Sequence, residues 1–133
     1  MTGQLLAVEL GDPERSLIVN AGHPSPLLQR DGDIERVELE IDFPFGMPFE
    51  NRLAAQPLEL RRDDRLILFS DGVVEARPDG GQPFGNARLV ETLQRLKHLP
   101  PREAARGLVA EVRAHRAGDL TDDATIIILD LPR

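Results

Sequence analysis

The run Arg65–Ser70 (RLILFS) limits the fold most strongly, because it is apolar without interruption and has turn residues at both ends. Asp71-Gly72 follows it at once. A short continuous apolar run between turn signals predicts a β-strand. A similar run, Ala124–Leu129 (ATIIIL), predicts a last buried strand that is entered from Thr121-Asp122-Asp123.

The N-terminal half of the chain predicts further short strands. They cover residues 4–10, 16–20, 26–29, 34–39 and 53–60. The turn chemistry of Gly11–Arg15 and of Asp31-Gly32-Asp33 predicts two β-hairpins. Pro57 weakens the strand 53–60 or places it at a sheet edge, and residues 42–50 read as a loop.

Two helices are predicted before the last strand. Asn86–Lys97 has apolar residues at helical spacing, and a second helix follows Pro100-Pro101. Its expected buried face comprises Ala105, Leu108, Val109 and Val112. The predicted fold class is therefore α+β, with helices packed on mainly antiparallel β-sheet.

Composition narrows the range of functions. The 133 residues suffice for a single domain, and no apolar run is long enough to span a membrane. The chain has no cysteine and no recognisable export signal, which fits a cytoplasmic protein. Its net charge of -7 argues against nucleic acid, and the basic cluster Arg61, Arg62 and Arg65 is interrupted by two aspartates. The excess of acidic residues is compatible with a carboxylate-lined cation site. The alternative is that it only makes the surface soluble.

Two acidic motifs lie at the ends of predicted apolar strands. Asp71-Gly72 follows Arg65–Ser70, and Asp122-Asp123 precedes the strand Ala124–Leu129. If these strands are neighbours, carboxylates from distant parts of the chain meet at one rim of the sheet. Oxygen ligands of this kind suit Mg²⁺ or Mn²⁺. The alternative is a turn dipeptide and a solvated loop.

The segment Asn20–Pro24 (NAGHP) breaks the strand pattern. His23 is open to three readings: a general acid, a metal ligand, or a hydrogen-bonded loop residue. Asn20 and Gly22 are expected to shape a tight turn, with a positive φ at Gly22.

Taken in order, several segments resemble the PPM-type (type 2C) metal-dependent serine/threonine protein phosphatases, in the branch of the sporulation stage II protein E phosphatase. These segments are NAGHPSPLL at 20–28, PFGM at 44–47, LELRRDDRLILFSDGVVEAR at 58–77, QPFGNARL at 82–89 and DDATIIIL at 122–129.

The resemblance implies an α-β-β-α sandwich in which two divalent ions, Mn²⁺ or Mg²⁺, activate a water that attacks phosphoserine or phosphothreonine. It implies that Asp71 and Asp122 are metal ligands and that Gly72 contributes through its backbone shape. Asp123, His23 and Asn20 are secondary candidates, and no catalytic residue is assigned beyond the metal ligands. The implied substrate is a regulatory phosphoprotein of the anti-anti-sigma type, in signal transduction that controls sigma factors.

One motif of such phosphatases has no counterpart. Their Gly-Asp-x-x-Gly-x-Gly segment carries an aspartate that bridges both metals, and Gly11-Asp12 lacks the following glycines. We therefore expect residues 1–133 to be one domain that forms the C-terminal portion of a phosphatase domain. The alternatives are a non-catalytic interaction or regulatory module that keeps the scaffold, and a simple divalent-cation-binding domain.

A partial domain is also expected to expose apolar surface. The runs Leu5–Leu10, Leu66–Phe69 and Ile126–Leu129 would then lie at open faces or edges, covered by a missing N-terminal segment or by a second copy in a homodimer.

Overall fold

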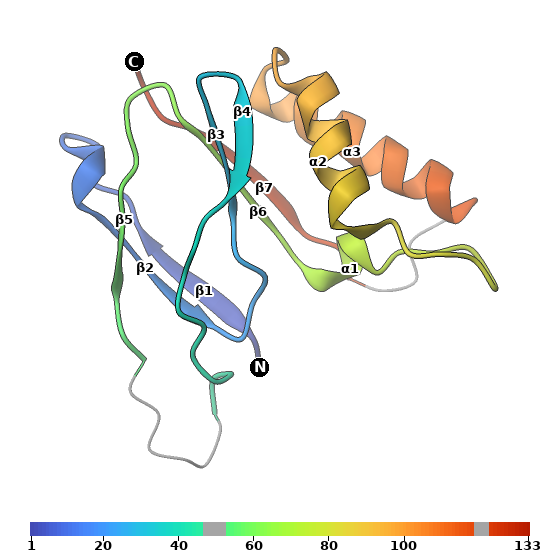
Figure 1. Ribbon diagram of the computed structural model, residues 1–133, viewed down its shortest axis with the longest axis horizontal. Coiled ribbons are helices and arrows are strands. Elements are labelled where there is room, and N and C mark those ends of the chain that lie inside the picture. The colour runs from blue at the N-terminus through green and yellow to red at the C-terminus, as the bar shows by residue number, and fades with distance from the viewer. Residues whose placement is uncertain (47–52, 119–122) are drawn as a thin grey trace.

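A computed structural model describes residues 1–46, 53–118 and 123–133. Its elements follow the predicted order of strands, helices and a last strand (Figure 1). They are β1 (Gly3–Ala7), the short 3₁₀ helix η1 (Pro13–Arg15), β2 (Ser16–Ala21), β3 (Leu27–Arg30), β4 (Asp33–Arg36), β5 (Gln56–Leu58), β6 (Arg65–Phe69), α1 (Asp71–Val74), α2 (Gly85–Leu96), α3 (Pro101–Arg116) and β7 (Ile126–Asp130).

The strands form two antiparallel sheets. The first has the order β1-β2-β5 and the second the order β4-β3-β6-β7. Both predicted hairpins are present, as β1–β2 and as β3–β4. β5 is shorter than predicted and lies at an edge, as Pro57 requires. The α+β class with mainly antiparallel sheet is confirmed.

The second sheet is the middle of three layers. Ile67 and Phe69 of β6 pack with buried residues of α2 and α3, whereas Leu66 packs with Ile18 and Leu58 of the first sheet. Figure 1 shows α2 and α3 together on one side of this sheet. Full burial of each such side chain contributes about 1.5–3 kcal/mol, so β6 is held from both faces.

The predicted exposure of Leu66–Phe69 is wrong for this reason. Leu66, Ile67 and Phe69 are buried because the first sheet covers one face of β6 and the helices cover the other. The prediction holds for Leu5 and Ile127, whose side chains are 62% and 53% exposed.

Leu5 lies on the outer face of the first sheet. Its neighbour Leu6 and the paired Ile18 belong to the core between the sheets, so alternation turns Leu5 and Leu17 to the other side. Phe45 lies against Gly3 at one end of this face. No described helix or strand covers Leu5 and Leu17, and Leu17 is 43% exposed.

Smaller corrections concern local structure. The buried face of α3 comprises Ala104, Leu108 and Val112. Ala105 and Val109, which were also predicted to be buried, are half-buried. Asp71 begins a short helix rather than a plain turn. No helix in the described part of the chain is long and apolar enough to cross a membrane.

Arg65, one arginine of the basic cluster, is held by internal contacts, whereas Arg61 and Arg62 are exposed. The Arg65 side chain is 8% exposed, and its Nε and Nη2 donate to the Asp130 carboxylate at 2.6 and 2.9 Å. Nη2 also donates to the Leu99 carbonyl at 2.7 Å, which ties β6 to the segment between the helices. This cation supports the fold and is not offered to a polyanion.

Candidate active site

The two acidic motifs meet because β6 and β7 are antiparallel neighbours, with Phe69 opposite Ile126. Beyond this pair the strand ends stay joined. The Ser70 N–H donates to the Thr125 carbonyl at 3.0 Å, and the Thr125 N–H donates to Ser70 Oγ at 2.8 Å. The end of β6 and the entry to β7 therefore form one rim of the second sheet (Figure 1).

Gly72 makes the closest contact at this rim. A β-carbon at Gly72 would stand 2.2 Å from the Asp123 carbonyl oxygen and 3.3 Å from Ala124 Cα. Only a residue without a side chain lets the two backbones approach so closely. The segments carrying Asp71 and Asp123 are thus held against each other.

The carboxylates of Asp71 and Asp123 are both exposed at this rim. Asp122, the other predicted ligand, lies outside the described residues. In the described part of the chain, no cluster of three or more acidic or histidine side chains is placed to hold a metal. Carboxylate oxygens suit Mg²⁺ or Mn²⁺, which keep several waters and bind few protein oxygens, so the donor chemistry of Asp71 and Asp123 fits either ion.

The segment Asn20–His23 forms the predicted tight turn. Asn20 is fully buried, and its Oδ1 accepts the His23 N–H at 3.0 Å. Gly22 has φ +66°, and a β-carbon there would stand 3.0 Å from Pro44. The Asp42 N–H donates to the Asn20 carbonyl at 2.8 Å, so the turn also anchors the loop that begins near residue 42. Asn20 therefore has a structural role.

His23 and Asp71 line one pocket of about 300 Å³ beside the rim. The pocket wall also includes Arg36 from the end of β4 and Asn86 from the first turn of α2. The sequence offered one weak signal for Arg36, which is a single cation in a run of glutamates. It offered none for Asn86.

Known structures share the fold that carries this site. The phosphatase domain of the cell fate determinant SpoIIE from Bacillus subtilis, presoaked with Mn, matches with a TM-score of 0.78 and 24% identity, over 100% of this chain and 57% of that one. The SiaA-PP2C domain of Pseudomonas aeruginosa matches with a TM-score of 0.76 and 20% identity, over 97% of this chain and 51% of that one. The structure of the RsbU and RsbW domains of Rv1364c from Mycobacterium tuberculosis matches with a TM-score of 0.76 and 21% identity, over 98% of this chain and 37% of that one.

The chain therefore has the fold of PP2C-type phosphatase domains, and it spans about half the length of the matched SpoIIE and SiaA structures. The sequence profile of the family described as stage II sporulation protein E (SpoIIE) matches residues 4–132. The chain belongs to that family. The comparison with curated proteins gives no match.

Proposed function

We propose that this chain supplies part of the active site of a metal-dependent phosphoprotein phosphatase. Asp71 and Asp122 would be ligands of Mg²⁺ or Mn²⁺, and the substrate would carry phosphoserine or phosphothreonine. The observation that carries the proposal is the contact between Gly72 and the Asp123 carbonyl, because it joins the two acidic segments at one rim. Family membership and the shared fold support the reaction class.

Each residue of the rim has a role that follows from its position. Asp71 places a carboxylate at the start of α1, and Gly72 lets the backbone of Asp123 and Ala124 pass close to it. Ser70 and Thr125 hold the two strand ends in register, which limits the movement of both acidic segments. In such enzymes divalent cations polarise the phosphoryl group and activate the attacking water.

Asp12 does not serve as a further ligand. It lies in the turn before η1, and β2 runs from there to the turn that contains His23. Six strand residues at about 3.4 Å each separate the two ends, a distance of roughly 17–20 Å. Residues 1–133 are therefore proposed to be the C-terminal portion of the phosphatase domain, without the aspartate that would bridge two ions.

The proposed substrate is a regulatory phosphoprotein, in keeping with an anti-anti-sigma protein. The similar structures support this proposal, because they include the cell fate determinant SpoIIE and a protein with RsbU and RsbW domains. A non-catalytic interaction module is the second candidate. The uncovered outer face of the first sheet, with Leu5 and Leu17 exposed, favours it.

Metal binding tests the proposal. In calorimetric titration with Mn²⁺ we expect weak binding, with a Kd on the order of 0.1–1 mM for a site with few carboxylates. Asp71→Asn and Asp122→Asn should each abolish it. Asp12→Asn is the matched control, since it removes the same charge at the far end of β2. Binding that survives Asp71→Asn would refute the assignment.

A further inference from the structure

The pocket beside Asp71 is built by segments that are far apart in the sequence. Its wall combines the turn at His23, the end of β4 at Arg36, the start of α1 at Asp71 and the first turn of α2 at Asn86. Its volume of about 300 Å³ is enough for a phosphoryl group with several waters. Apolar side chains, among them Phe69 and Val74, form the rest of the lining.

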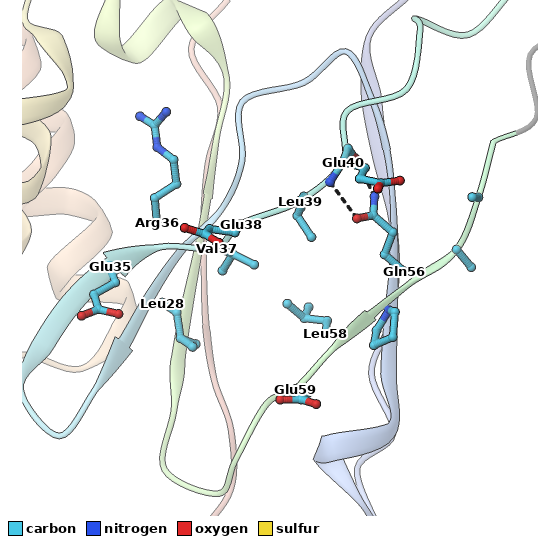
Figure 2. A pocket seen from close by; sticks show the side chains of 13 residues that line it. Leu28, Glu35, Arg36, Val37, Glu38, Leu39, Glu40, Gln56, Leu58 and Glu59 are labelled. Carbon is cyan, nitrogen blue, oxygen red and sulfur yellow. Dashed lines mark hydrogen bonds between the residues drawn. The ribbon is translucent and has the colours of Figure 1, made fainter.

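Arg36 is the cation of this pocket. In the described part of the chain its guanidinium forms no ion pair or hydrogen bond, whereas Arg30 and Arg65 each bind a carboxylate through two nitrogens. Figure 2 shows the Arg36 guanidinium pointing away from Leu39 and Leu58, which lie in the groove next to β5. An arginine without an internal partner keeps its planar set of donors for an external anion.

We propose that Arg36 binds the phosphoryl group of the substrate in this pocket, next to a cation held at Asp71. This inference rests on the proposed phosphatase function. A guanidinium donates two parallel hydrogen bonds to phosphate oxygens, and the Asn86 amide is a further donor in the same wall. His23 also lines the pocket, and its backbone is fixed by the hydrogen bond to Asn20.

The charges in the pocket predict in which direction phosphate affinity changes when Asp71 is substituted. Without a cation, the Asp71 carboxylate repels a phosphate dianion in the same pocket. Removing this negative charge should therefore strengthen phosphate binding, although the same change should abolish metal binding. An anion bound close to Asp71 responds in this way, and its loss of affinity in Arg36→Gln places it near Arg36 as well.

The experiment is a titration of the metal-free chain with inorganic phosphate, followed by NMR of the arginine Nε–H and histidine ring signals. We expect the Arg36 and His23 signals to shift. Arg36→Gln should weaken phosphate binding by about tenfold or more. Asp71→Asn should strengthen it by about threefold or more. Arg102→Gln, an exposed arginine of α3, is the control and should change nothing.

Arg36→Lys separates charge from geometry, because lysine keeps the charge and loses the paired donors. Intermediate affinity supports the proposal. Phosphate binding that is equal in wild type and Arg36→Gln would overturn it. The Arg36→Gln variant should still bind Mn²⁺, with an affinity that is equal or slightly higher, because the change removes a positive charge near Asp71. Loss of the phosphate site is therefore distinguished from loss of the metal site.

Discussion

The Asp123 carbonyl lies directly over the α-carbon of Gly72, where any β-carbon would come within 2.2 Å of the oxygen. The atoms that a β-carbon would meet belong to the backbone of Asp123 and Ala124, so the clash cannot be relieved by a change of side-chain rotamer. Position 72 therefore has to be glycine because the segment before β7, which is distant in the sequence, passes so close to it. Its contact sets how close the two acidic segments come.

Gly72→Ala should for this reason loosen the rim. We expect the free energy of unfolding to fall by about 1–3 kcal/mol, as for overpacking elsewhere, and Mn²⁺ affinity to fall with it. Urea denaturation and calorimetry measure the two effects. Gly11→Ala is the control, since its β-carbon would meet only Glu9 Oε1 at 4.0 Å. Equal stability of both variants would contradict the contact.

A second prediction concerns the Arg30–Asp64 pair, which lies away from the rim. Asp64 is 2% exposed, and Arg30 donates to it through Nε at 3.0 Å and Nη2 at 2.6 Å. The hydrogen bond to Asp64 raises the pKa of the Arg30 guanidinium, so this cation stays charged under working conditions. The pair links β3 to the turn before β6.

Arg30→Met should destabilise the chain by about 3 kcal/mol, because it leaves a buried carboxylate without its charged partner. Thermal denaturation followed by circular dichroism measures this loss. Asp63→Asn breaks the exposed pair of Asp63 and Arg133, and it should cost less than about 1 kcal/mol. An equally small effect of Arg30→Met would show that Asp64 finds other donors.

The third prediction concerns turnover. The 133-residue chain should hydrolyse p-nitrophenyl phosphate no faster than background with Mn²⁺ present, because the proposed ligands Asp71 and Asp122 would hold one ion at most. Fusion to a segment that carries Gly-Asp-x-x-Gly-x-Gly should restore turnover. Asp71→Asn in the fusion should remove it again. Mn²⁺-dependent turnover by the chain alone would show that no bridging aspartate is needed.

The sequence predicted the elements that local patterns determine. The apolar run of β6, the helical spacing of α2 and the turn chemistry at Gly22 each depend on neighbouring residues, and each is confirmed. The sequence predicts that the two acidic motifs meet only if β6 and β7 are neighbours, because strand pairing depends on contacts between distant segments. The two strands do pair, antiparallel, and this pairing brings Asp71 near Asp123.

What the sequence did not predict arises from tertiary packing. The pocket that joins Arg36, Asn86 and His23 gathers three separate elements, and no short pattern contains them. The burial of Leu66 could not be predicted, because it depends on the first sheet, which covers one face of β6. The predicted role of Asp122 stays a prediction, because that residue lies outside the described part of the chain.

The outer face of the first sheet leads to the last prediction. Leu5 and Leu17 are exposed there, and no described element covers them. Apolar side chains on a sheet face associate in water, where each buried Å² contributes about 25 cal/mol. The net charge of -7 opposes association, but salt screens this repulsion beyond about 8–10 Å, while apolar burial persists at contact.

We therefore expect the chain to dimerise through this face, and the dimer to persist when salt is raised. Light scattering over a dilution series measures the monomer–dimer equilibrium. Leu5→Gln should shift it towards monomer, because it replaces an apolar contact without changing the net charge. Glu14→Gln in η1 changes the charge and leaves the face intact, so it should favour the dimer slightly or have no effect. A wild-type chain that stays monomeric at high concentration would show that this face needs no cover, and would strengthen the case for a module that folds by itself.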